Sequence, residues 1–86
     1  MKLSDTVDMM NSSDYKERLK AEYFQSVIRY NALKDMLEKW SIGKLESAPK
    51  CPISLCKMQL EFMANYCAAL EARAAIEGID LGKRYI

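Results

Sequence analysis

The sequence predicts an all-α fold in which two long antiparallel helices form a hairpin, a short helix precedes them, and several chains oligomerise into a helical bundle. Three observations support this prediction. Two long segments contain no glycine, and each carries apolar side chains at alternating spacings of three and four residues. The two stripes also match in length. Finally, glycine and proline lie in the short segment that separates them, as a turn requires.

The first expected element is a short helix over residues 4–10, with Ser4 as its cap and Val7 and Met10 on one face. The run Asn11-Ser12-Ser13-Asp14 then interrupts the helix. Its serines are candidate caps for the next helix.

The first long helix is expected over residues 14–40, with Asp14 and Glu17 near the positive end of its dipole. Gly43 can end this helix, and Pro49 keeps it from restarting. Its apolar stripe, in which Ser26 fills one gap, consists of Leu19, Tyr23, Tyr30, Leu33, Leu37 and Trp40.

The second long helix is expected over residues 52–77, because Pro52 fits a first helical turn and Gly78 fits a left-handed C-cap. A tail over residues 79–86 follows. The stripe of this helix consists of Ile53, Cys56, Leu60, Met63, Cys67, Leu70 and Ala74.

An antiparallel hairpin brings these stripes together in one register, with Lys16 beside Glu77 at the open end. The expected layers are Trp40 with Ile53, Leu37 with Cys56, Leu33 with Leu60, Tyr30 with Met63, Ser26 with Cys67, Tyr23 with Leu70, and Leu19 with Ala74.

Apolar residues also lie on faces that the hairpin cannot bury. Exposed apolar strips of this size mark interfaces, so we expect a homo-oligomer in which neighbouring chains complete the core. The short amino-terminal helix is expected to cover one of the two strips at most. The expected interface residues are Leu55, Met58, Phe62, Tyr66 and Ile76 on the second long helix, and Phe24 and Ile28 on the first.

Length and composition limit the domain count and the partners. With 86 residues the chain is a single domain over residues 1–86, and a domain of this size buries only about 60% of its unfolded surface. The net charge of +1 gives no general attraction to nucleic acid or anionic membranes. No apolar run reaches the roughly 20 residues of a membrane span, and the amino terminus is acidic where a signal peptide is apolar. We therefore expect a cytoplasmic protein.

The side chains offer little chemistry for catalysis. The chain has no histidine, which removes the commonest general base and zinc ligand, and it has no phosphate-binding glycine loop. The spacing of Cys51, Cys56 and Cys67 matches no metal motif, so we interpret these residues as packing residues. Acidic pairs such as Asp35 with Glu38 fall on exposed faces. We expect neither an enzyme, nor a metal site, nor a cofactor.

Anion binding remains open, because arginine has a planar fork for phosphate and tyrosine can stack on a base. Taken one at a time, the arginines also fit ordinary surface ion pairs. Basic and acidic residues alternate along the first long helix, which argues against duplex nucleic acid as a partner. The candidate ligand-binding residues are Arg18, Arg29, Arg73, Lys83, Arg84, Tyr15 and Tyr85.

Four strings in order, SSDYKERLKAEYFQ, IRYNALKDML, CPISLCKMQLEFM and LEARAAIEGIDL, resemble a family of small phage and prophage proteins. Members of that family are labelled as related to a gene product of a crAss-like phage. The resemblance covers residues 13–81 and implies a phage origin and an accessory role, for which counter-defence is typical. The protein would then act in the cytosol of the bacterial host.

In general build the chain is similar to small helical oligomers that sequester the cyclic nucleotide signals of bacterial immunity, such as anti-CBASS and anti-Thoeris sponges. We therefore expect an oligomeric sponge that binds a cyclic nucleotide between its subunits. The alternative is a protein-protein inhibitor of a host defence factor, comparable to an anti-CRISPR. A structural protein of the virion is a third possibility.

Overall fold

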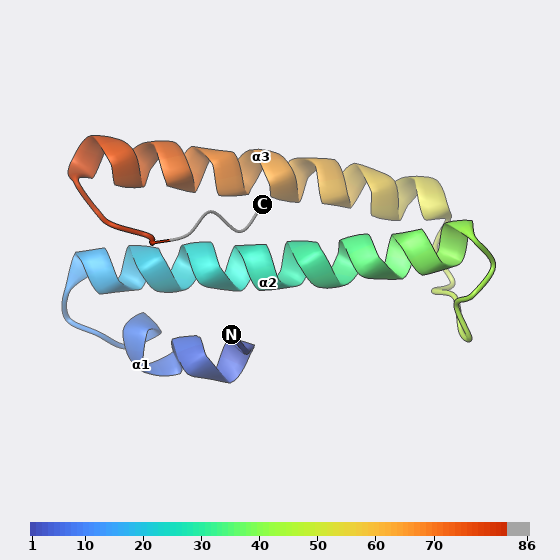
Figure 1. The fold of residues 1–86 in the computed structure, drawn as a ribbon, viewed down its shortest axis with the longest axis horizontal. Coiled ribbons are helices and arrows are strands. Elements are labelled where there is room, and N and C mark those ends of the chain that lie inside the picture. Colours follow the sequence, from blue (N-terminus) through green and yellow to red (C-terminus); the bar gives the residue numbers. More distant parts are fainter. Residues whose placement is uncertain (83–86) are drawn as a thin grey trace.

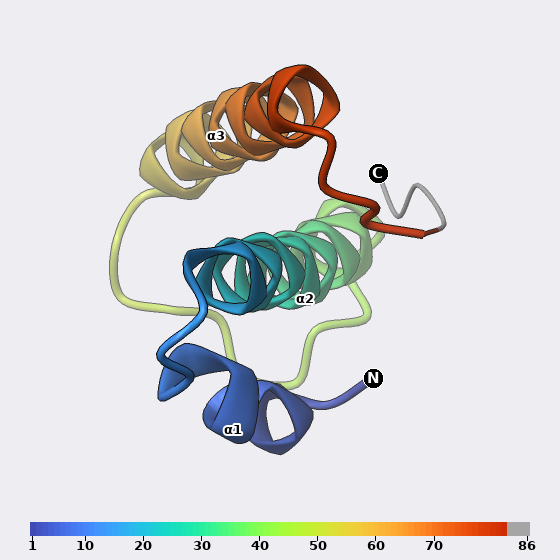
Figure 2. The same cartoon turned by 90° about the vertical axis from the view of Figure 1, so that its left-hand side faces the viewer.

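The computed structural model describes residues 1–82, and the regular structure in this part of the chain is entirely helical. A 3₁₀ turn, η1 (Leu3–Thr6), continues into the short helix α1 (Val7–Met10), and the long helices α2 (Tyr15–Ser41) and α3 (Ile53–Glu77) follow. The prediction of an all-α fold is thereby confirmed. Figure 1 shows α2 and α3 side by side with opposite directions, and Figure 2 shows the short amino-terminal helix on the other side of α2.

The amino-terminal helix contacts α2 through a hydrogen bond between Gln25 and the buried residue Thr6. Thr6 is completely buried, and its hydroxyl donates to the carbonyl of Leu3 at 2.7 Å. The side-chain amide of Gln25 donates to the same hydroxyl at 3.1 Å and also contacts the sulfur of Met10. The prediction that Ser4 caps this helix is wrong, because the helix begins at Leu3, one residue earlier than expected. The backbone N–H of the capping residue Lys2 donates to the Asp5 carboxylate.

Helix α2 starts at an aspartate and not at a serine. The Asp14 carboxylate accepts a hydrogen bond from the backbone N–H of Lys16 at 2.9 Å, which satisfies one of the unpaired donors of the first turn. Ser12 supports this cap, since its hydroxyl accepts from the backbone N–H of Asp14 at 3.0 Å. Gly43 adopts φ +72° just beyond the end of the helix and allows the chain to turn away.

Helix α3 begins after Pro52 and ends at Gly78, which adopts the left-handed conformation with φ +69°. The backbone N–H of Ile79 then donates to the carbonyl of Ala74 at 2.8 Å, and the chain folds back along the hairpin. Ile79 is buried, with 6% of its surface exposed. The sequence indicated only a tail at this point.

The core lies along the seam between α2 and α3. One buried cluster joins Tyr23 with Leu70 and another joins Leu19 with Ala74, as the expected register requires. Leu81 packs against both clusters. None of the helices within residues 1–82 is both long and apolar enough to cross a membrane.

One layer of the seam differs from the prediction. Val27, which the stripe omitted, is buried with Cys67, while Ser26 is only half-buried. The Ser26 hydroxyl donates to the carbonyl of Glu22, one helical turn earlier, at 2.8 Å. The seam therefore passes through a valine, whose methyl groups fill the space that a serine cannot.

Candidate functional site

Two facing stripes of side chains line one side of the hairpin, and we call them the lateral face. Their members are three or four residues apart, except that Tyr66 and Arg73 are separated by seven residues, or two helical turns, so each stripe lies on one side of its helix. Residues 79–82 lie on the opposite side, where they line a hollow together with Ala68, Ala72 and Ala75. The lateral face consists of Tyr15, Arg18, Glu22, Gln25, Arg29, Ala32 and Met36 on α2, and Gln59, Met63, Tyr66, Arg73 and Glu77 on α3.

A polar network joins the two helices at the open end of this face. The Tyr15 hydroxyl accepts a hydrogen bond from the Arg73 guanidinium at 2.7 Å and donates to the Glu77 carboxylate at 2.9 Å. Arg73 also lies 3.8 Å from Glu77. The hydrogen bond to Tyr15, more than the nearby carboxylates, raises the pKa of Arg73. The expected pairing of Lys16 with Glu77 is wrong, because Tyr15 and Arg73 engage this carboxylate instead.

A second bridge lies farther along the same face, where the Tyr66 hydroxyl donates to the Glu22 carboxylate. Arg18 belongs to the same stripe of α2, but its guanidinium donates to the carbonyl of Ser12 at 2.9 Å. Arg18 is therefore directed toward the segment that precedes α2. The structure brings Tyr15 and Arg73 into contact and leaves Arg18 with a separate partner.

Two apolar hollows continue the lateral face beyond these bridges. The first, of about 450 Å³, lies between η1, α2 and α3, and Arg29 stands at its wall. The second, of about 560 Å³, lies on α3 around Phe62. Both are lined by Gln59 and Met63, so they adjoin one another. The remaining lining residues of the first hollow are Leu3, Ile28, Ala32, Leu33 and Met36.

The expected interface residues fall into two groups. Those on α3 are exposed: Leu55 by 48%, Met58 by 46%, Phe62 by 63%, Tyr66 by 45% and Ile76 by 86%. Those on α2 are half-buried within the chain itself. Phe24 packs against the core with its ring 5.8 Å from that of Tyr23, and Ile28 lies in the first hollow with Leu3. The core thus takes up Phe24 and the amino-terminal segment lies beside Ile28, whereas the strip of α3 stays open.

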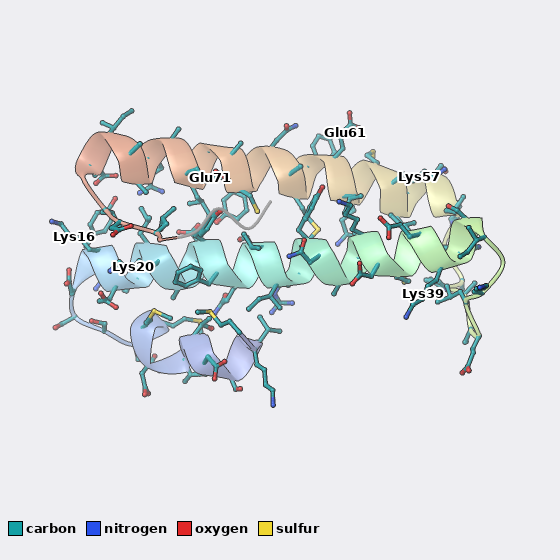
Figure 3. All side chains as sticks on the ribbon, viewed as in Figure 1. Lys16, Lys20, Lys39, Lys57, Glu61 and Glu71 are labelled. Atoms are coloured by element: carbon teal, nitrogen blue, oxygen red, sulfur yellow. The ribbon has the colours of Figure 1, made fainter. Side chains whose placement is uncertain are left out.

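Three candidate ligand-binding residues, Lys83, Arg84 and Tyr85, lie outside the described residues. The lysines do not gather on one face in the described part. Figure 3 shows Lys16, Lys20 and Lys39 spread along the length of α2. Arginine therefore supplies the cationic groups of the lateral face.

The cysteines are placed as packing residues. Cys56 and Cys67 are buried, and the sulfur of Cys51 lies 3.4 Å from that of Cys56. Contact with Cys51 raises the pKa of Cys56, and burial, followed by the charge of Glu71, raises that of Cys67. Within residues 1–82, no three acidic or cysteine side chains are grouped to hold a metal ion.

Sequence reasoning did not find Glu22 or the bridging role of Tyr66. The spacing of Tyr15, Arg18, Glu22, Gln25 and Arg29 was an available signal, because these residues recur at three- and four-residue intervals beside the apolar stripe. A polar stripe next to a seam is placed at the edge of the helix contact, where long side chains can reach the other helix.

Comparisons with known proteins give one family. Searches among curated proteins and among solved structures give no match. The model of the family described as Sequestin matches residues 13–76, which include all of α2 and nearly all of α3. This description does not carry the label of a crAss-like phage that the resemblance implied. Because the match covers most of the hairpin and more than half of the sequence, the chain belongs to the Sequestin family.

Proposed function

We propose that this protein is a phage-encoded counter-defence protein that sequesters a cyclic nucleotide immune signal in the cytosol of the bacterial host. The family name Sequestin fits a sequestering function. Such a protein holds its ligand without converting it, so the role requires binding groups and no catalytic group.

The network of Tyr15 and Arg73 is the observation that carries the proposal. The Arg73 guanidinium is exposed, and its hydrogen bond to the Tyr15 hydroxyl fixes its position at the edge of the hairpin. A positioned guanidinium loses little side-chain entropy when it binds a phosphate. Glu77 already lies 3.8 Å from Arg73, so a bound phosphate takes over the place of this carboxylate.

The apolar hollow beside Arg29 supplies the second requirement of a nucleotide site. Nucleotides combine an anionic phosphate with a flat base, and apolar side chains such as Ile28 and Met63 offer a surface for the base. The hollow is open toward the solvent along the lateral face. We expect an oligomer to close it, because a sponge must bury most of its ligand to hold it tightly.

Isothermal titration calorimetry tests this function with cyclic dinucleotides, cyclic trinucleotides and cyclic ADP-ribose isomers. We expect one class to bind in the submicromolar range, about −8 kcal/mol or stronger, with no turnover of the recovered ligand. Arg73→Gln should lower the affinity at least tenfold. Lys39→Gln, which removes a cation from the other end of α2, is the matched control and should bind normally. Absence of binding to every compound contradicts the proposal.

The exposed apolar strip on α3 also favours a second candidate, a protein-protein inhibitor of a host defence factor. An inhibitor of this kind would use Phe62 and Tyr66 on its target. Phe62→Ala should then abolish inhibition of the purified target. A strip variant that keeps full inhibitory activity excludes this candidate.

A further inference from the structure

The outer side of α3 carries a second helical seam, opposite to the one that packs on α2. Its positions alternate in spacings of three and four residues, as in a helix that packs against another helix. All of them are exposed, and none is charged. The outer seam consists of Leu55, Met58, Phe62, Asn65, Ala69, Ala72 and Ile76.

The outer seam is large enough to act as an interface. Helix α3 is about 37 Å long and about 10 Å wide, so its outer side covers roughly 400 Å² in projection. Apolar patches of this size on a monomer mark interaction sites. Figure 3 shows Glu61 projecting from α3 on the side away from α2.

The distribution of side-chain size along the seam identifies the occupant. Leu55, Met58 and Phe62 are large and stand in the first half of α3, whereas Ala69 and Ala72 are small and stand in the second half, where Ile76 near the helix end is the one large apolar residue of the seam. A second copy in antiparallel orientation places Phe62 of each chain on the small Ala72 of the other, and Met58 packs on Ile76 at the ends of the contact. A parallel copy places phenylalanine on phenylalanine and alanine on alanine, which leaves gaps. The seam is complementary to itself under a two-fold rotation, as symmetric dimers require.

We propose that α3 pairs with α3 of a second copy in antiparallel orientation along the outer seam. In the register that matches the sizes best, Phe62 packs on Ala72 of the second copy and Met58 packs on Ile76. Asn65 then lies near the two-fold axis against Ala69, where a single polar side chain can fix the register. The helices stack in the order α2, α3, α3 and α2.

This register also places residues of the two lateral faces side by side. Tyr66 lies next to Tyr66 of the second copy at the axis, and Arg73 lies next to Gln59 of the second copy. Because Gln59 lines the hollow that contains Arg29, each hollow receives an arginine from the other chain. The anion site is therefore composite, with Arg29 from one copy and Arg73 from the other. The composite anion site, unlike the pairing of the two helices, rests on the proposed function.

Disulfide cross-linking tests the pairing without any ligand. Tyr66→Cys should give a covalent dimer within minutes of mild oxidation, because the two introduced thiols meet at the axis. Glu61→Cys is the matched control. Glu61 is exposed on the same helix, but in this register it lies far from Glu61 of the second copy. Phe62→Cys reports a parallel pair. If Phe62→Cys cross-links faster than Tyr66→Cys, or if Glu61→Cys cross-links equally well, the antiparallel register is wrong.

Sedimentation equilibrium measures the association itself. Wild-type protein should have twice the mass of one chain at micromolar concentration. Ala69→Glu should shift it to the mass of a single chain, because it introduces a charge into the seam while keeping a strong helix former. Asn31→Glu, at an exposed position of α2, is the control and should remain dimeric. A wild-type protein that is monomeric at 100 micromolar, roughly −5.5 kcal/mol or weaker, overturns the pairing.

Mixing two variants tests the composite site with whichever compound of the calorimetric panel the wild-type protein binds. Arg29→Gln and Arg73→Gln should each lose at least tenfold in affinity. An equimolar mixture, exchanged through mild denaturation, should regain tight binding at about a quarter of the wild-type sites, because each mixed dimer contains one intact pair. No recovery contradicts the composite site. No binding by the wild-type protein contradicts the proposed function, whereas the cross-linking result stands by itself.

Discussion

Glu77 occupies the position at which an anion would meet Arg73. Its carboxylate accepts from Tyr15 and lies 3.8 Å from the guanidinium, so it balances the positive charge when no ligand is present. In the proposed site this carboxylate would lower the affinity for anions, while its contact with Arg73 would keep the arginine extended across the hairpin. The charge and the geometry of the site thus depend on the same side chain.

Glu77→Gln should increase the affinity for an anionic ligand, because the competing negative charge is removed while the hydrogen bond from Tyr15 can persist. We expect a severalfold lower dissociation constant in calorimetry. Glu61→Gln removes an equal charge from another part of α3 and is the control. Equal or weaker binding by Glu77→Gln would indicate that Arg73 does not contact the ligand.

The cysteines should differ in their reactivity toward alkylating reagents. The pKa of Cys56 and that of Cys67 are raised above the ordinary value of 9.0, so their thiols stay protonated at pH 8 and react slowly. Cys51, which is only half-buried, should be labelled first by iodoacetamide, as mass spectrometry of peptides can show.

The same shifts affect folding, since the protonated thiols are favoured in the folded state. Their contribution to stability is present below pH 9.0 and is lost as the pH rises above it. Cys67→Ala is the control, because it removes the buried group and should flatten the alkaline decline in melting temperature. If the variant and the wild-type protein lose stability alike above pH 9, Cys67 is not responsible.

At the scale of elements, the ends of the helices decide how the hairpin closes. Asp14 starts α2 and Gly78 ends α3, and both bring their helix ends to the open side where Tyr15 meets Arg73. The turn after Gly78 also directs Ile79 into the core. A cap at this end therefore supports the candidate site as well as the helix.

Gly78→Ala should destabilise the fold by about 1–2 kcal/mol, because a residue with a side chain is strained at φ +69°. An added Cβ atom meets nothing within 4 Å, so the cost is conformational and not steric. Gly78→Asn should lose less, since asparagine tolerates this conformation. Urea denaturation measures both variants, and equal losses would point to a different cause.

Leu70→Ala should destabilise the hairpin by about 2–5 kcal/mol, because it leaves a cavity in the best-packed part of the seam. Ile42→Ala, at a position that is 66% exposed beyond the end of α2, is the control and should change stability by less than about 0.5 kcal/mol. Chemical denaturation followed by circular dichroism compares them. Similar midpoints would mean that the α2 and α3 seam is not the core.

The sequence predicted the helices and their register because apolar periodicity is a direct consequence of packing two helices face to face. It failed where the contacts are specific to a few atoms. Strict four-three alternation after Tyr23 selects position 26, whereas the buried residue is Val27, four positions after Tyr23. Ile79 entered the core through a turn that composition does not reveal. In the candidate site, the arginines were predicted by residue type, but the partners Tyr15 and Glu77 depend on side-chain geometry across the hairpin.

At the scale of the whole molecule, the amino-terminal helix makes the two sides of the hairpin unequal. It covers part of α2 through Leu3 and Thr6, whereas the outer side of α3 remains open. A chain with one covered side and one open side is suited to form a closed pair, because both exposed faces are used in a single contact. A chain with both sides of the hairpin open would instead favour extended assemblies.

Deletion of residues 1–11 should therefore change the assembly as well as the stability. It exposes Ile28 and leaves the Gln25 amide without Thr6, so we expect a lower melting temperature and larger species in light scattering. Thr6→Ser keeps the hydroxyl and should behave like the wild-type protein. A truncated protein with unchanged mass and stability would show that this helix does not protect α2.

The two seams of α3 also determine how its sequence can drift over evolutionary time. In the proposed pairing, one side of α3 is committed to α2 and the other to a second copy, so only narrow strips of α3, such as those that hold Lys57 and Glu61, would remain free to accept new residues. Variation among related chains should therefore be confined to these strips. A substitution on the outer seam should appear together with a compensating change at its partner position on the same helix, such as Ala72 for Phe62, because each chain supplies both halves of the contact.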